Sequence, residues 1–253
     1  MMKNKQKIPL ISFIIPVLNE EKDIAKTILP LKELDWFSKE IIVADGGSSD
    51  NTVAIAETLA DKVYQRPQGE KNKSIAENRN KGAGLAVGKY LFYLDCGVKI
   101  YRLKEFIKEV IKQMAAGHKL VGITSEIRFY PAEESEIDRL HLWVINKTIK
   151  GLNKVKVGAG MGWVQVVRRE AFEKIGGYNE ELTNQEDADL FRRLNKVGRT
   201  KVLKNFVAYG SAERYHQDGW AKVNGRWLVN WLSYILRGKS YSKEWKPVKK
   251  MEN

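Results

Sequence analysis

The chain has 253 residues, of which 43% are hydrophobic and 30% charged, and this mixture allows a packed α/β core and excludes a disordered or fibrous chain. Its formal charge of +13 favours anionic partners, which include phosphates, anionic lipid headgroups and nucleic acid. No stretch approaches the roughly 20 apolar residues of a spanning helix, no signal peptide stands out, and the single Cys96 excludes an internal disulfide, so we expect a cytoplasmic protein.

The first part of the chain alternates apolar strands with helices. ISFIIP, residues 11–16, is apolar without interruption, as in a parallel strand covered on both faces. EIIVAD, residues 40–45, has the same character, and the turn GGSSDNT leads from it into a helix with Ser49 or Asp50 as N-cap. This order predicts a doubly wound, Rossmann-like parallel sheet. The other elements expected here are helices over residues 20–34 and 74–87, a short strand near Val63 and a strand over residues 89–95.

Two carboxylates stand at the carboxyl ends of predicted strands. Asp45 ends the second strand, and Asp95 ends the strand in KYLFYLDCGV. Ligands of doubly wound sheets bind outside this edge, so both residues are candidates for a nucleotide site. The alternative is that each is a turn residue whose side chain bonds its own backbone.

The second half of the chain has longer elements. Residues 119–129 predict a strand, and GAGMGW leads into another strand and a short helix that ends at Gly176 or Gly177. TNQEDADLFRRLNKVG predicts a helix with Thr183 or Asn184 as N-cap and Gly198 at its end. A further helix is expected over residues 132–149. The apolar residues that these helices carry are Ile137, Leu140, Val144 and Ile145 in the first, and Leu190 and Leu194, facing the core, in the last.

Several stretches together resemble the family 2 glycosyltransferases, enzymes of the GT-A fold that use nucleotide-activated sugars. SFIIPVLNEEKDIAKTI is similar to the first strand and helix of that family, and IIVADGGSSDNT to its second strand and base-binding turn. NRNKGAGLAVGKYLFYLD resembles the segment that leads to the family's Asp-x-Asp motif. VRREAFEKIGGYNEEL followed by EDADLFRRL resembles the acceptor side, so the resemblance covers residues 8–198 in order.

The resemblance implies an α/β GT-A fold, a Rossmann-like, mostly parallel sheet flanked by helices. It implies one catalytic domain over residues 8–210, with a nucleotide-sugar-binding half at 8–118 and an acceptor half at 119–210, and a helical tail at 211–253. The implied activity moves a sugar from a UDP- or GDP-sugar to an acceptor hydroxyl by single displacement with inversion. The base, the sugar and the acceptor are open.

The donor-side residues follow from the same resemblance. The loop from Pro16 through Leu18 to Glu20 is expected beneath the nucleobase. Asp45 is expected to hydrogen-bond the base, which a carboxylate at a strand end can do toward an imide or amide N–H. Asp95 matches the first Asp of Asp-x-Asp, which contacts the ribose and the metal shell. The cations implied at the diphosphate are Lys73 and Arg79, with a solvated helix face as the alternative for both.

Asp187 is the expected general base. In similar enzymes the Asp of a Glu-Asp pair at this helix start removes the proton of the acceptor hydroxyl. We expect its carboxylate to be held ionised, because it lies in the first turn of a helix. The alternative is a capping box with Thr183 or Asn184. The nearby carboxylates that could be confused with it are Glu186 and Asp189.

Gly97 departs from the family pattern. It replaces the second Asp of Asp-x-Asp, the main metal ligand, and Cys96 suits Mg²⁺ or Mn²⁺ poorly because these ions prefer oxygen. Three interpretations stay open. Asp95 and His216 hold a metal with the donor diphosphate, cations replace the metal at the leaving group, or the protein binds without turnover. The candidate cations are Lys73, Arg79, Lys99 and Arg214.

The tail from residue 211 predicts an amphipathic helix rich in Trp. Its apolar residues recur at four-residue steps, and basic residues flank them. Such a helix lies in a membrane interface, packs on the catalytic domain or pairs with a second subunit. The first outcome would place the protein at the inner face of the membrane with a lipid-linked acceptor, and the last would make a homodimer. The apolar residues of this helix are Val223, Trp227, Leu228, Trp231, Leu232 and Ile235, and the basic residues that flank them are Lys222, Arg226, Arg237 and Lys239.

Three rival functions differ in what they require. A silent nucleotide-sugar-binding protein is the first alternative, and Gly97 is its motive. A nucleic-acid-binding protein rests on charge alone, and since no such module is recognisable, nucleic acid is not an expected partner. A nucleotidyltransferase should carry a Gly-rich phosphate loop after the first strand, where the chain has PVLNEEKD.

Overall fold

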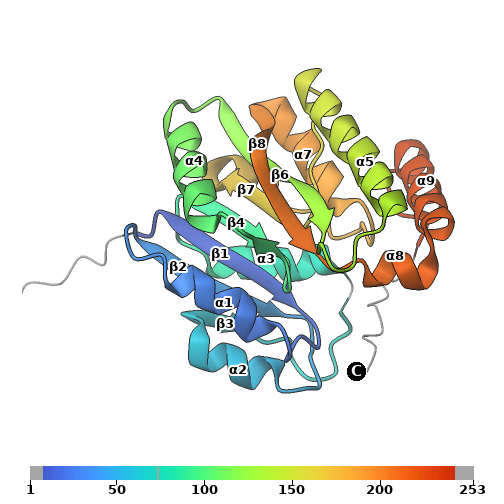
Figure 1. Cartoon of the computed structure of the whole chain (residues 1–253). Helices are drawn as coiled ribbons and strands as arrows, with labels where there is room; N and C mark the ends of the chain where they lie inside the picture. Colours follow the sequence, from blue (N-terminus) through green and yellow to red (C-terminus); the bar gives the residue numbers. More distant parts are fainter. Residues whose placement is uncertain (1–7, 73, 243–253) are drawn as a thin grey trace, which may run out of the picture.

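The computed structural model contains one eight-stranded sheet. The structure describes residues 8–72 and 74–242, apart from the side chain of Ile235. The strand order is β3-β2-β1-β4-β7-β6-β8-β5, with helices on both sides (Figure 1). Neighbouring strands from β3 to β4 run parallel, β7 runs antiparallel to β4 and β6, and β8 is parallel to β6. The expected mostly parallel GT-A sheet is confirmed.

The first half of the sheet follows the predicted alternation of strands and helices. Helix α3 begins after Ser74, whose hydroxyl accepts a hydrogen bond from the Glu77 N–H. Helix α2 has Asn51 as N-cap instead of Ser49 or Asp50. The Asn51 side chain makes no capping bond, and the Asp50 carboxylate accepts hydrogen bonds from the N–H and hydroxyl of Thr52. The elements are β1 (Ile11–Val17), α1 (Ile24–Lys32), β2 (Lys39–Asp45), α2 (Thr52–Leu59), β3 (Lys62–Tyr64), α3 (Ile75–Leu85) and β4 (Tyr90–Leu94).

The second half contains three elements that the sequence analysis did not predict, namely β5, α4 and β8. Strand β8 closes the sheet against β6, and β5 is a two-residue edge strand on β8. The elements are β5 (Lys99–Ile100), α4 (Leu103–Ala115), β6 (Leu120–Phe129), α5 (Glu136–Lys154), β7 (Val164–Arg168), α6 (Arg169–Lys174), α7 (Glu186–Val197), β8 (Arg199–Gly210), α8 (Glu213–Asp218) and α9 (Trp220–Arg237).

Two apolar layers cover the faces of the sheet because strand side chains alternate between them. Phe13 and Ile15 face the layer of α1, α2 and α4. Ile14 faces the opposite layer, where α3, α6 and α7 pack. Helices α5, α8 and α9 share a smaller core around Phe129. Both faces of the sheet are therefore covered by helices.

Two helices differ from the sequence analysis in their details. Helix α7 begins after Gln185, which has a left-handed φ of 64°, and Thr183 instead donates its hydroxyl to the Ser242 carbonyl. The capping alternative with Thr183 or Asn184 is therefore wrong. On α5, Ile137, Leu140 and Val144 are exposed and Ile145 is half-buried, because the sheet-facing side uses other residues of the helix.

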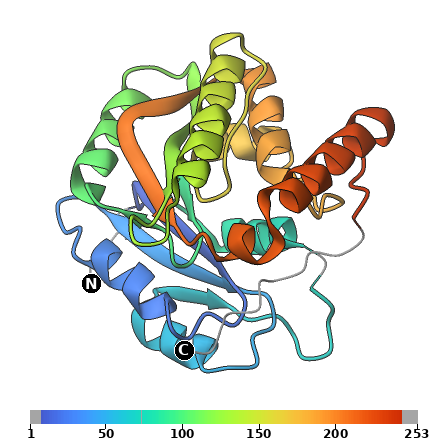
Figure 2. The same ribbon diagram turned by 45° about the vertical axis from the view of Figure 1, so that its right-hand side comes forward.

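The tail forms α8 and α9, which lie beside α5 on one side of the molecule (Figures 1 and 2). Val223 is buried and Trp227 half-buried in the core around Phe129, so one face of α9 packs on the domain. Among the described residues, no helix has the length and apolar character needed to cross a membrane.

Candidate active site

The loops after β1 and β2 hold each other through side chains that bond backbone N–H groups. The Asn19 N–H donates to Ser48 Oγ at 2.8 Å, and the Ser49 N–H donates to Asn19 Oδ1 at 2.8 Å. Asn19 adopts a left-handed φ of 56°, which Asn tolerates better than most residues. The Glu20 N–H donates to Thr52 Oγ1 at 2.7 Å. The loop after β1 is therefore fixed at the carboxyl edge of the sheet.

Asp45 holds the turn that follows its own strand. Its carboxylate accepts hydrogen bonds from the N–H groups of Gly47 and Ser48 and from the Ser48 hydroxyl. The side chain is buried and belongs to the turn, as the structural alternative predicted. Contact with a nucleobase stays a prediction for this residue.

A cavity of about 150 Å³ opens beside these loops. It brings together four sequence-predicted residues, Pro16, Leu18, Glu20 and Asp95. Asp45 and Arg79 are not among its lining residues, and Lys73 lies outside the described part of the chain. The lining is completed by Val17, Asn72, Ile75, Asn78 and Cys96.

The sequence analysis missed the two asparagines of this cavity. The buried Asn72 Oδ1 has no hydrogen-bond partner among the described residues, although buried polar atoms usually have one. Asn78 is placed by Arg66, whose Nη2 donates to Asn78 Oδ1 at 2.9 Å. Arg66 is also paired with Glu77 at 2.9 Å. The sequence signal that could have found Asn78 is its place in NRNKG, one residue before Arg79.

Arg79 lies in an ion-pair network, and its contact with a diphosphate stays a prediction. Its side chain is buried, with Nη2 2.8 Å from Asp95 Oδ1 and Nη1 2.8 Å from Glu186 Oε1. Nη2 also donates to the Gly162 carbonyl at 3.3 Å. The guanidinium therefore joins the end of β4 to the start of α7, and two carboxylates already neutralise it.

Asp187 lies next to this ion pair. Its Oδ2 accepts the Gly162 N–H at 2.8 Å, and its Oδ1 accepts the Ala188 N–H at 2.7 Å. Arg79 and Asp187 both bond Gly162, Arg79 through its carbonyl and Asp187 through its N–H. The Asp187 carboxylate therefore lies beside the Asp95–Arg79–Glu186 network. One loop residue thus positions both groups.

The pKa of Asp187 is raised to about 7. Burial of the carboxyl group is the main cause, and the neighbouring Glu186 carboxylate adds to it. Arg79 and the N–H groups of Ala188 and Gly162 act in the opposite direction but do not outweigh burial. Burial therefore acts against the expected ionising effect of the helix start and raises the pKa of this group toward neutral pH.

The two neighbouring carboxylates are already in ion pairs. Glu186 pairs with Arg79, and Asp189 pairs with Arg193 at 2.6 Å and accepts the Tyr234 hydroxyl at 2.5 Å. Within the described residues, Asp187 makes no salt bridge and is held by backbone N–H groups. Of the three acidic residues at the start of α7, Asp187 is the one free to accept a proton.

His216 does not meet Asp95. Its Nε2 lies 2.9 Å from Asp138 Oδ2, and the Trp220 indole N–H donates to Asp138 Oδ1 at 2.7 Å. The described residues contain no group of three or more His, Cys, Asp or Glu side chains that could hold a metal ion. His216 is thus engaged by Asp138, and a metal held by Asp95, His216 and the donor diphosphate stays a prediction.

Gly97 shapes the turn after Asp95. Its φ of 79° is left-handed, a conformation that favours glycine. Its N–H donates to Thr27 Oγ1 at 3.0 Å, and its carbonyl accepts the Tyr130 hydroxyl. The residue in the second Asp-x-Asp position therefore contributes backbone geometry and no ligand.

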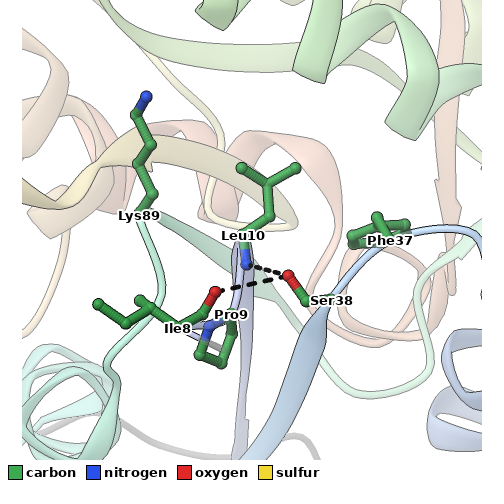
Figure 3. A pocket seen from close by; sticks show the side chains of 6 residues that line it. All are labelled: Ile8, Pro9, Leu10, Phe37, Ser38 and Lys89. Atoms are coloured by element: carbon green, nitrogen blue, oxygen red, sulfur yellow. Dashed lines mark hydrogen bonds between the residues drawn. The ribbon is translucent and has the colours of Figure 1, made fainter. Parts of the chain in front are cut away.

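A larger hollow of about 460 Å³ lies at the opposite edge of the sheet, at the amino end of β1 (Figure 3). The Leu10 N–H donates to Ser38 Oγ there at 3.1 Å. Lys89 is the one charged residue of a mostly apolar lining that also includes Ile8, Pro9, Leu10, Phe37 and Ser38. Since parallel sheets bind ligands at the carboxyl ends of their strands, we assign the donor site to the smaller cavity.

Solved structures share this fold. Mannosyltransferase PcManGT from Pyrobaculum calidifontis, in complex with GDP-Man and Mn²⁺, superposes with a TM-score of 0.67 at 18% identity, over 93% of this chain and 66% of that chain. Residues 1–349 of S. aureus TarS in complex with UDP superpose with a TM-score of 0.61 at 18% identity, over 89% of this chain and 71% of that chain. These likenesses establish the GT-A fold.

Curated relatives are similar in sequence. Succinoglycan biosynthesis protein ExoA of Rhizobium meliloti is 28% identical over 196 residues, which cover 73% of this chain and 58% of that protein. Uncharacterized glycosyltransferase YibD of Escherichia coli is 32% identical over 102 residues, which cover 40% of this chain and 29% of that protein. The chain thus spans little more than half of ExoA and under a third of YibD. The family model described as Glycosyl transferase family 2 matches residues 12–176, and the chain belongs to that family.

Proposed function

We propose that the protein is a glycosyltransferase that moves a sugar from a UDP- or GDP-sugar to an acceptor hydroxyl by single displacement with inversion. The observation that carries the proposal is the place of Asp187, a carboxylate beside the Asp95–Arg79–Glu186 network that makes no salt bridge within the described residues, and its raised pKa supports the same role. A base with a pKa near the working pH transfers protons most effectively. The printed names of PcManGT and TarS, with GDP-Man and UDP, support a nucleotide-sugar donor.

The donor nucleotide occupies the cavity beside the loops of β1 and β2 in this proposal. Asn72 Oδ1 is buried there without a partner among the described residues, and it would accept an N–H of the base. Asp95 lines the same cavity and is 24% exposed, so one of its oxygens can reach the ribose while the other holds Arg79. Pro16 and Leu18 supply apolar contact with the base.

The chemical step forms one bond and breaks another. Asp187 accepts the proton of the acceptor hydroxyl while that oxygen attacks the anomeric carbon of the sugar. The bond from this carbon to the diphosphate oxygen breaks, and the nucleoside diphosphate leaves with the electron pair. Attack opposite the leaving group inverts the anomeric configuration.

The leaving diphosphate needs positive charge, and Arg214 is our candidate to supply it. Arg214 is adjacent to Tyr215, whose pKa is raised to about 12 by burial and further by the Asp187 carboxylate, so α8 starts close to the base. Burial lowers the pKa of Arg214, and the charge of Arg226 acts in the same direction. A leaving diphosphate would bring negative charge to this cation. Lys99, which lies over the Tyr130 ring at 5.4 Å, is the second candidate.

The test compares donor turnover with donor binding. Asp187→Asn should lower the release of nucleoside diphosphate from a UDP- or GDP-sugar about 10²–10⁴-fold, because the amide cannot accept the proton. Binding of the donor should remain within about twofold, since Asp187 does not line the donor cavity. Asp35→Asn, which removes an exposed carboxylate, is the control for the loss of charge.

The rival is a silent nucleotide-sugar-binding protein, which Gly97 motivates. That rival predicts no turnover of any donor by the unchanged protein and no difference between it and Asp187→Asn. A lipid-linked acceptor and a homodimer remain predictions of the sequence analysis. The comparison of Asp187→Asn with the unchanged protein does not test them.

A further inference from the structure

Helices α5 and α9 expose an unusual amount of apolar surface. Trp143 on α5 is 58% exposed, and Trp231 on α9 is 50% exposed. Contiguous exposed apolar surface marks interaction sites, whereas single exposed residues do not. The exposed large apolar residues are Ile137, Leu140, Trp143 and Val144 on α5, and Leu228, Val229, Trp231, Leu232 and Leu236 on α9.

The two helices are joined where they begin. The Trp220 indole donates to Asp138 Oδ1 at 2.7 Å and stacks on the His141 ring, with centroids 4.3 Å apart and planes at 11°. Leu142 and Val223 lie in the same buried core between them. In Figure 1 both helices lie toward the right-hand side of the molecule, and Figure 2 shows that they diverge from their junction. Their outward residues are therefore held in place by an ordered junction.

Beyond the first turn of α5, which contains Glu136 and Asp138, the charged residues of both helices are basic. From Arg139 to its end, α5 contains no Asp or Glu, and α9 contains none at all. Within the described residues, no carboxylate pairs with Lys147, Lys154 or Arg237. Lys147 lies over the Trp143 ring at 5.6 Å. The apolar residues are thus mixed with cations whose charge is not neutralised nearby.

We propose that the outer faces of α5 and α9 form a docking surface for an anionic lipid bilayer. Trp side chains and apolar residues insert at the level of the headgroups, and the cations attract anionic lipid. A second copy of the chain is a poorer fit, because it would bring two positively charged faces together. The proposal does not depend on the glycosyl transfer argued above.

The docking surface adjoins the candidate active site. Gln185, the residue before α7, donates from Nε2 to the Trp227 carbonyl at 2.7 Å, and the Tyr234 hydroxyl bonds Asp189 on α7. Helix α9 therefore braces the turn that carries Asp187. A bilayer on the outer faces of α5 and α9 lies next to the helix whose first turn holds the proposed base.

The test is co-sedimentation of the full chain with two kinds of vesicle, phosphatidylcholine alone and phosphatidylcholine mixed with phosphatidylglycerol. The protein should sediment with the mixed vesicles, and the fluorescence of its exposed tryptophans should shift to the blue. The variant Leu140→Glu/Leu232→Glu should lose on the order of tenfold or more in bound fraction. The control is Leu29→Glu on α1, because Leu29 is 48% exposed and Leu232 is 44% exposed. It should bind like the unchanged protein.

A second pair of variants distinguishes weaker membrane binding from a folding defect. Lys147→Gln and Arg237→Gln change exposed side chains, and each should weaken binding to the mixed vesicles about fivefold. Failure of the unchanged protein to bind the mixed vesicles would overturn the proposal. So would equal loss in Leu29→Glu, or a concentration-dependent dimer that Leu140→Glu/Leu232→Glu abolishes. Nucleotide titration of the same samples reports on the donor site separately.

Discussion

Arg79 connects parts of the chain that lie far apart in sequence. It follows Asn78 of the donor cavity, and its buried guanidinium lies between Asp95 after β4 and Glu186 at the start of α7. A planar guanidinium can bond two carboxylates at once, which a lysine ammonium cannot do with the same geometry. The relative position of the donor cavity and Asp187 therefore depends on this side chain.

Arg79→Met should lower the free energy of unfolding by about 3–5 kcal/mol, because it leaves Asp95 and Glu186 without their buried partner. Urea unfolding measures this change. The control is Arg169→Met, which removes a half-exposed ion pair with Glu173 and should cost at most about 1 kcal/mol. Equal losses in the two variants would show that the buried network contributes no more than a surface pair.

Asp187 predicts a dependence of turnover on pH. Its pKa is raised to about 7, and only the deprotonated form can accept a proton, so turnover should fall about tenfold per pH unit below pH 7 and level off above it. Glu186→Gln should move the midpoint to lower pH, because the Glu186 carboxylate is the second cause of the raised pKa. Rates of donor turnover across this range measure both effects. A rate independent of pH from about 5 to 8 would contradict the role of Asp187.

At the scale of elements, the amino end of α5 organises the tail. Asp138 is buried and completes a capping box with Ser135, while it also bonds His216 of α8 and Trp220 of α9. Burial alone would raise the pKa of Asp138, but the hydrogen bonds from Ser135, His216 and Trp220 outweigh it and hold the pKa well below its usual range. One carboxylate thus fixes three helices.

Asp138→Asn should lower the free energy of unfolding by about 1.5–3 kcal/mol at neutral pH, the range for hydrogen bonds to a charged group. Since the pKa is lowered in the folded state, this contribution is present above the unfolded pKa near 4 and is lost as pH falls below it. Urea unfolding at neutral and acidic pH measures the difference. A stability gap between the two proteins that does not narrow at acidic pH would contradict the ionised cap.

His216→Gln should leave donor binding unchanged, because the His216 side chain bonds Asp138 at this junction of helices.

Helix α5 also shows the limit of periodicity as a guide. The pattern selects Ile137, Leu140 and Val144 as one stripe, and the spacing is helical as expected. The buried side of the helix nevertheless carries Leu142, Asn146 and Ile149, because Asn146 bonds the backbone of Ile127 and anchors that side to β6. A period defines a face, and only the packing partners decide whether that face is inside.

At the scale of the whole molecule, the carboxyl-end rule predicts which residues meet at one edge of the sheet. Pro16, Leu18 and Glu20 follow β1, and Asp95 follows β4, so parallel strands bring them to one edge. The GT-A fold follows from the same alternation of strands and helices, read together with the family motifs. These features are local in sequence or set by strand order, so they can be predicted without coordinates.

The remaining features depend on contacts between distant residues. Arg79 and Glu186 are 107 positions apart, and His216 and Asp138 are 78 apart, so no local pattern predicts either pair. Strand β8 escaped prediction because Lys and Asn interrupt its apolar residues, although it pairs with β6 along most of its length. The raised pKa of Asp187 likewise comes from burial that only the folded chain creates.

The most direct measurement is calorimetric titration of the protein with UDP, GDP and their sugar conjugates, in Mn²⁺ and again in EDTA. The donor cavity predicts saturable binding of one of these nucleotides, and the cationic stabilisation proposed for the leaving group predicts that binding persists in EDTA. Binding that appears only with Mn²⁺ would contradict the cationic stabilisation proposed for the leaving group. Binding of no nucleotide in either condition would contradict the donor site itself.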